Sequence, residues 1–169
     1  MKIHKSLRPE LAVSKNNAKY VLTEPWLDAE NKVIVATDGR HMVVLPVEIE
    51  EGDTSGHVSA EALAGARKDK RNEFAIIGCN GKLDLLNGAA LPRPDLGNYP
   101  TYQQVIPDQT KRGFAIAFDA ELLRNIQRAF GSQFVTLSFQ ADEHPEWCPI
   151  TVKPSGQRDV HSDQTIGVL

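Results

Sequence analysis

The sequence predicts an α+β fold with antiparallel sheets and two helices on one side. Short apolar runs separated by polar turns predict strands along most of the 169 residues. Two segments, 59–71 and 119–130, instead combine helix-capping residues with helical spacing of apolar residues. One order of elements, strand, helix and three strands, occurs twice, over 57–93 and over 113–169. A repeated β-α-β-β-β unit implies antiparallel sheets covered by the helices.

Composition and charge narrow the class of protein. A hydrophobic fraction of 41% and a charged fraction of 24% are ordinary for a soluble globular protein. The net charge of −3 excludes a chain that is basic throughout, but it leaves room for a local basic face. Cys79 and Cys148 form no CxxC pair, which indicates free thiols in a reducing compartment. We see no secretory signal and no run near the ~20 apolar residues of a membrane span, so we expect a cytoplasmic protein without membrane contact.

The first strands are expected between residues 19 and 49. The runs KYVLTEPWLD (19–28) and KVIVATD (32–38) flank a polar AEN turn, which predicts a hairpin. The run HMVVLPVEI (41–49) continues the sheet, and Pro46, which has no N–H to donate, indicates an edge or bulged strand. A polar knuckle, TDGRH (37–41), separates the last two runs. Its local chemistry predicts a bend between strands.

Capping and turn residues set the limits of the repeated unit. Ser59 can cap the first helix, and Asn80-Gly81 predicts a hairpin turn within FAIIGCNGKLDLLNG. Asp119 can cap the second helix, and Gly131 is placed to end it. Four apolar residues of the second helix follow the spacing of a single stripe: Leu122, Leu123, Ile126 and Phe130.

A proline-rich connector, 89–113, joins the two repeats. It holds four prolines and the large anchors Tyr99, Tyr102 and Ile106, so we expect an extended segment pinned to a surface. The sequence then divides into three parts within one compact domain overall. They are an N-terminal extension (1–18), strands with the first repeated unit and the connector (19–108), and the second repeated unit (109–169).

Two ordered motifs resemble a known family. VIVATDGRHMVVLPV (33–47) resembles the ATDGHRL segment of bacterial sliding clamps, the β subunit of DNA polymerase III. NYPTYQQVIP (98–107) resembles the FPDYRRVLP connector of the same family, and the elements around both motifs match in order. The chain reads Gly39-Arg40-His41 where the family reads Gly-His-Arg. The sequence is therefore similar to a shortened relative, of phage or mobile-element type.

The resemblance implies a DNA-clamp-like fold and a non-enzymatic protein that tethers replication or repair factors to DNA. Helix-borne cations would contact the phosphates of double-stranded DNA without reading its bases. These candidates are Arg67, Lys68, Lys70, Arg71, Arg124 and Arg128. The resemblance also implies a groove that binds short peptides of DNA polymerases or repair proteins. Its candidates are Thr37, Gly39, Arg40, His41, Met42, Pro100, Val105, Ile166 and Val168.

Simpler interpretations stay open beside these. Charge runs are usually solvated helix faces, and the apolar groove candidates are equally suited to a core. A clamp-fold interaction module, an adaptor or decoy that does not encircle DNA, is the alternative function. Asp38 and His41 could form an acid/base pair, but no nucleophile motif or phosphate loop accompanies them. We therefore expect no enzyme, no catalytic residue, no metal and no cofactor, and we expect a homo-oligomer, since one domain cannot close a ring.

Overall fold

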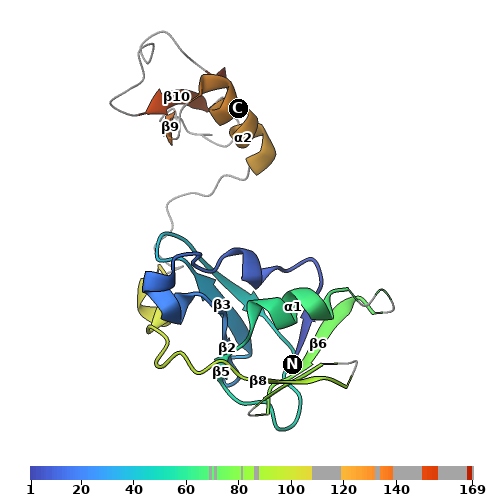
Figure 1. Ribbon diagram of the computed structural model, residues 1–169. Helices are drawn as coiled ribbons and strands as arrows, with labels where there is room; N and C mark the ends of the chain where they lie inside the picture. The colour runs from blue at the N-terminus through green and yellow to red at the C-terminus, as the bar shows by residue number, and fades with distance from the viewer. Residues whose placement is uncertain are drawn as a thin grey trace. The chain divides into compact units, whose positions relative to one another are not determined.

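The computed structural model describes most of the chain (Figure 1). The described ranges are 1–68, 70, 72–80, 82–85, 88–107, 119–131, 134–138, 150–155 and 167–168, with the side chains of Asn17, Tyr20, Gly167 and Val168 outside the description. Contacts divide the chain into two compact units, Met1–Ile106 and Pro107–Leu169. The division into 1–18, 19–108 and 109–169 stays a prediction.

The first sheet of unit 1 contains the predicted hairpin. Its strands, in the order β4-β3-β2-β5, are β4 (Met42–Pro46), β3 (Val33–Thr37), β2 (Trp26–Asp28) and β5 (Gly56–His57). All the pairings are antiparallel. Pro46 lies in an edge strand, as its missing N–H predicts.

The second sheet of unit 1 includes the start of the chain. Its order is β1-β6-β7-β8, with β1 (Lys2–His4), β6 (Phe74–Gly78), β7 (Lys82–Leu85) and β8 (Ala90–Pro92), again antiparallel. Lys2 also exchanges two backbone hydrogen bonds with Glu48, of 2.8 and 2.9 Å. Residues 2–4 were expected in an extension, but they join the second sheet to the chain that follows β4.

Helical segments of unit 1 lie before strands β2–β4 and again before strands β6–β8. The 3₁₀ segments η1 (Pro9–Leu11) and η2 (Asn17–Leu22) lie between β1 and β2, and α1 (Ala60–Ala66) lies between β5 and β6. The prediction of a strand from residue 19 is therefore wrong for residues 19–25, because η2 ends at Leu22 and β2 begins at Trp26. The backbone turns here because the Asn16 side chain accepts a hydrogen bond from the Ala18 N–H at 2.9 Å, which competes with strand formation.

Helix α1 begins where its cap predicts. The Ser59 hydroxyl accepts from the Ala62 N–H at 3.2 Å, and Glu24 accepts from the Ala60 N–H. The helix ends at Ala66, short of the predicted residue 71, with Arg67 as its C-terminal cap. Its buried Ala62 and Leu63 belong to the core, and α1 packs against β6, β7 and η1.

The core of unit 1 draws on both sheets and on α1. It consists of Met1, Ile3, Leu27, Ile34, Val47, Val58, Ala62, Leu63, Ala75, Ile77, Cys79 and Leu83. Cys79 is a free thiol, and burial raises its pKa to about 11. This thiol is therefore protonated and unreactive at neutral pH.

The described part of unit 2 contains one helix and a three-stranded sheet. Helix α2 (Ala120–Phe130) is capped by Asp119, whose carboxylate accepts from the Glu121 N–H at 2.8 Å, and ends at Gly131 with φ +64°. The sheet order is β11-β10-β9, with β9 (Phe134–Ser138), β10 (Thr151–Ser155) and β11 (Gly167–Val168), all antiparallel. The strand expected at 113–118 lies outside the described residues.

The α+β class with antiparallel sheets and two α-helices is confirmed. The order strand, helix and three strands is observed for the first predicted repeat, from β5 to β8. Among the described helices, none has both the length and the apolar character needed to cross a membrane.

Candidate functional site

The knuckle at residues 37–41 is a hydrogen-bonded turn that connects β3 to β4. The Asp38 carboxylate accepts from the backbone N–H groups of Arg40 and His41, at 2.8 and 3.1 Å. The Thr37 hydroxyl accepts from the Gly39 N–H at 3.0 Å and donates to the His41 carbonyl at 2.5 Å. Gly39 has φ +86°, a left-handed conformation that favours glycine. The predicted bend between strands is therefore what these five residues form.

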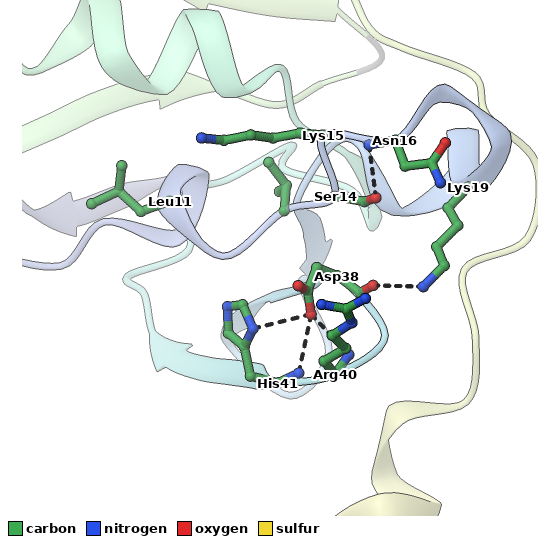
Figure 2. A pocket seen from close by; sticks show the side chains of 9 residues that line it. Leu11, Ser14, Lys15, Asn16, Lys19, Asp38, Arg40 and His41 are labelled. Carbon is green, nitrogen blue, oxygen red and sulfur yellow. Dashed lines mark hydrogen bonds and ion pairs between the residues drawn. The ribbon is translucent and has the colours of Figure 1, made fainter. Parts of the chain in front are cut away.

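Asp38 holds this turn together. The backbone hydrogen bonds from Arg40 and His41 lower the pKa of its carboxyl group, and its oxygen also lies 3.0 Å from the His41 Nδ1 (Figure 2). A carboxylate that is occupied by two backbone donors is an Asx-type turn residue. The Asp38–His41 contact therefore has a structural explanation that requires no acid/base chemistry.

A cavity of about 360 Å³ lies beside the knuckle (Figure 2). Its lining combines the turn with the segment before β2: Leu11, Val13, Ser14, Lys15, Asn16, Lys19, Asp38, Arg40 and His41. Lys19 donates to the Asp38 carbonyl at 2.9 Å and so connects η2 to the turn. Of the predicted groove residues, Arg40 and His41 line this cavity. Sequence reasoning missed Lys15 and Lys19, because residues 1–18 were set apart as an extension and Lys19 was assigned to a strand.

Two of the three predicted anchors, Tyr99 and Tyr102, pin the connector to unit 1, whereas Ile106 is 40% exposed. Tyr102 donates its hydroxyl to Asp28 on β2 at 2.9 Å, and the Tyr99 ring stacks on Trp26 with centroids 5.6 Å apart. Between and after these anchors, Pro100 and Val105 are exposed, and Val105 is 67% exposed. Val105 is thus accessible to a partner rather than part of the core.

The remaining groove candidates lie only partly within the described residues. Met42 is half-buried at the start of β4, opposite Thr37. Ile166 lies outside the described residues, and Val168 is described for its backbone, which pairs with Thr151 in unit 2. The knuckle and the connector are thus attached to the neighbouring strands β2 and β3 of one sheet. A shared peptide groove stays a prediction.

The predicted DNA contacts fall into different environments. Arg67 forms two 3.0 Å contacts with the Glu10 carboxylate and donates to the Lys5 carbonyl at 2.9 Å, and its side chain is only 11% exposed. A guanidinium held in this way stabilises unit 1, so we leave Arg67 out of the proposed DNA face. Lys68 and Lys70 are exposed, and Arg71 lies outside the described residues.

The two cations of α2 lie one turn apart on an exposed face. Arg124 pairs with Glu121 at 2.5 Å and remains about half exposed, and Arg128 occupies the last turn. A cation in the last turn is favoured by the helix dipole. None of the α2 side chains in the described range is buried, and Leu122 is 54% exposed.

Comparison with known proteins identifies the fold. No family model and no curated protein matches the sequence. The solved structure of the beta subunit from DNA polymerase of Streptococcus pyogenes is similar over 100% of this chain, with a TM-score of 0.59 and 14% sequence identity. The chain therefore has a clamp fold. The chain covers 49% of that subunit, and so spans about half its length. The clamp fold expected from the two motifs is confirmed.

Proposed function

We propose that this clamp-fold protein is a non-enzymatic tether that holds a replication or repair protein on DNA. The observation that carries the proposal is the likeness to a DNA polymerase β subunit over the whole chain. The two sequence motifs support it, because both attach to one sheet of unit 1 in the expected order. A tether of this kind needs a peptide groove and a cationic surface.

The peptide groove in this proposal lies between the knuckle and the connector. The turn at Thr37–Met42 supplies a backbone that is fixed by its own hydrogen bonds. Val105 supplies an exposed apolar side chain, and Lys15, Lys19 and Arg40 add charge beside the knuckle. Apolar walls with a few oriented polar groups are what peptide grooves use. A bound peptide with an apolar anchor and an acidic side chain would match this lining.

The DNA contacts in this proposal are exposed cations of each unit, taken separately. Lys68 and Lys70 follow the end of α1 in unit 1, and Arg124 and Arg128 lie on α2 in unit 2. All four are accessible to phosphate oxygens, and Arg71 stays a further candidate. Contacts of this type are independent of base sequence, which suits a protein that moves along a duplex. They also make the affinity fall steeply with salt.

Charge reversal on α2 tests the DNA contact. The double variant Arg124→Glu/Arg128→Glu should weaken binding to a fluorescent duplex and lower the slope of log K against log salt by about 1.8, at ~0.9 for each lost phosphate contact. Lys153→Glu, an exposed cation on β10 of the same unit, is the matched control. Equal DNA binding by the double variant and the control would favour the alternative, a clamp-fold adaptor or decoy that does not encircle DNA.

Substitution of the connector tests the groove. Val105→Asp should abolish binding of a peptide that carries a clamp-binding motif, measured by fluorescence anisotropy. Leu91→Asp on β8 places the same charge on another exposed apolar position of unit 1. If both variants bind the peptide as the parent does, the groove is not at the connector.

The oligomeric state and origin complete the proposal. A protein that encircles DNA in this way would be a homo-oligomer, which light scattering at high concentration measures directly. A strict monomer would remove the ring and leave the fold unchanged. A phage or mobile-element origin and a cytoplasmic location stay predictions of the sequence.

A further inference from the structure

Residues 94–101 of the connector, called the latch below, form no helix or strand. Within the described part of the chain, the hydrogen bond made by the latch backbone is local, from the Gly97 N–H to the Asp95 carboxylate at 3.3 Å. Both of these residues are exposed. A segment with so few backbone hydrogen bonds to its surroundings opens at a lower free energy than a paired strand.

The chain is fixed at both ends of the latch. Before it, Arg93 donates from its Nε to the His57 carbonyl and from its Nη1 to the Thr54 carbonyl, both at 2.8 Å. After it, the Tyr102 hydroxyl donates to the Asp28 carboxylate at 2.9 Å. The latch can therefore move between these two points while the rest of the connector keeps its place.

A cluster of three rings attaches the latch to unit 1. Tyr99 of the latch stacks on Trp26 of β2 with centroids 5.6 Å apart and an interplanar angle of 16°. The His57 ring of β5 meets Trp26 edge to face at 5.0 Å and lies 5.9 Å from the Tyr99 ring. His57 is only 2% exposed. The closed latch thus contacts a buried imidazole.

A cavity of about 420 Å³ lies along the first half of the latch. Its lining combines latch residues with Arg93, β5 and the start of β2: Trp26, Ser55, Gly56, His57, Arg93, Pro94, Asp95, Gly97 and Asn98. The latch is therefore incompletely packed here, and the Tyr99 ring provides the contacts that hold it to β2 and β5.

The surroundings of His57 favour a neutral imidazole. Burial lowers the pKa of the ring and the charge of Arg93 acts in the same direction, whereas a hydrogen bond to the Val21 backbone and the charge of Asp95 oppose them. The Nε2 is buried and has no hydrogen-bond partner within the described residues. Tyr99 offers no negative charge, because burial raises the pKa of its hydroxyl to about 12. A second proton on His57 would therefore create a buried charge with an unpaired N–H.

We propose that the latch opens when His57 takes up a proton. An imidazolium needs water or a counter-charge at its Nε2, and lifting Tyr99 from Trp26 admits water to it. Strand β2 does not yield in place of the latch, because β3 and β5 pair with it on its two sides. Arg93 stays charged throughout, so its end of the latch stays fixed. This device operates with or without the proposed DNA and peptide partners.

A fall in pH from 7.5 to 5 should open the latch. The pKa of His57 in the closed latch lies below the value of about 6.5 of an exposed imidazole, so the closed latch is most stable above pH 6.5 and loses stability below it. If the closed state binds no proton, the ratio of open to closed latch rises by about 30-fold over this range. Burial opposes ionisation of Asp28, but its hydrogen bonds outweigh burial and lower its pKa, so Tyr102 keeps a charged acceptor at pH 5.

NMR of the full chain labelled with ¹³C-tyrosine follows the opening. The chain has three tyrosines, and replacing each by phenylalanine assigns its signal. The Tyr99 ring signals should move toward those of an exposed tyrosine as the pH falls to 4.5, because the Trp26 ring no longer shields them. Their midpoint should equal that of the His57 ring protons and lie below pH 6.5. The Tyr102 signals should stay in place and serve as the reference within the same connector.

Two histidine variants assign the response to its cause. His57→Gln keeps a neutral polar side chain but removes the titration, so the Tyr99 signals should stay those of the closed latch down to pH 4.5. His41→Gln removes an exposed histidine of the knuckle and should leave the Tyr99 response unchanged. Burial raises the pKa of Glu24 toward this pH range, and any effect of Glu24 would persist in His57→Gln.

A shared midpoint for Tyr99 and His57 that disappears in His57→Gln supports the latch. Titration of His57 without movement of Tyr99 overturns it, because the closed state then accommodates the charge. A Tyr99 response that persists in His57→Gln, movement of Tyr102 together with Tyr99, or an imidazole that stays neutral until unit 1 unfolds overturns it as well. If His57→Gln does not fold, the two midpoints in the parent chain still decide between these outcomes.

Discussion

Replacing Arg67 by methionine should destabilise unit 1 and leave DNA binding unchanged. The guanidinium makes two contacts with Glu10 and one with the Lys5 carbonyl, so it ties the end of α1 to η1 and the chain after β1. The side chains of Arg67 and Glu10 are only 11% and 12% exposed. Removing one partner of a fully buried pair costs about 3–5 kcal/mol and an exposed pair is worth about 0.2–1 kcal/mol, so we expect a loss of about 2–3 kcal/mol.

Urea unfolding followed by Trp26 fluorescence measures this loss. With an m-value of about 1–2 kcal/mol per M, the midpoint should fall by roughly 1–3 M. The double variant Arg67→Met/Glu10→Met should recover part of the loss, because it leaves no unpaired carboxylate among apolar neighbours. A variant Arg67→Met with an unchanged midpoint and weaker duplex binding would refute this reasoning and return Arg67 to the DNA face.

Three further predictions concern turns, caps and pH. Gly39→Ala should destabilise unit 1 by about 1–2 kcal/mol, because Gly39 has φ +86°. Gly65→Ala within α1 should instead stabilise unit 1 by about 0.5–1 kcal/mol. Changes of the same sign in chemical denaturation would contradict the different backbone requirements of these two glycines. Ser59→Ala should cost about 0.5–1 kcal/mol in the same assay, since Glu24 still accepts from the Ala60 N–H, and a larger loss would show that Glu24 does not cap α1. Burial opposes ionisation of Asp28, but hydrogen bonds from Asn31 and Tyr102 outweigh burial and lower the pKa of Asp28 in the folded state. The ionised Asp28 therefore stabilises the fold above its unfolded pKa of about 3.9. This stabilisation is lost as the pH falls through the folded-state pKa. Thermal melts should therefore show a smaller loss of stability below about pH 4 in Asp28→Asn than in the parent, and identical pH profiles would exclude the effect.

Local chemistry predicted the elements whose signals lie within a few residues. The Ser59 and Asp119 caps, the Gly131 helix end and the edge position of Pro46 all follow from the residue itself and its near neighbours. The connector was also predicted as a pinned segment, because Tyr99 and Tyr102 are too large and apolar to stay in solvent.

The sequence did not predict features that depend on residues far apart in the chain. Arg67 stands in a run of cations, and only its partner Glu10, 57 residues away, distinguishes it from the exposed Lys68. The three-residue β1 carries too short an apolar pattern to predict a strand.

Strand β1 has a consequence for how the protein can be shortened. It is hydrogen-bonded to β6 on one side and, through Lys2, to Glu48 on the other. Deleting the first four residues would therefore uncover the edge of β6 and, on the other side, the backbone N–H and C=O of Glu48. Because bare strand edges pair with those of other molecules, such a truncated protein should precipitate on purification rather than persist as a loosened monomer.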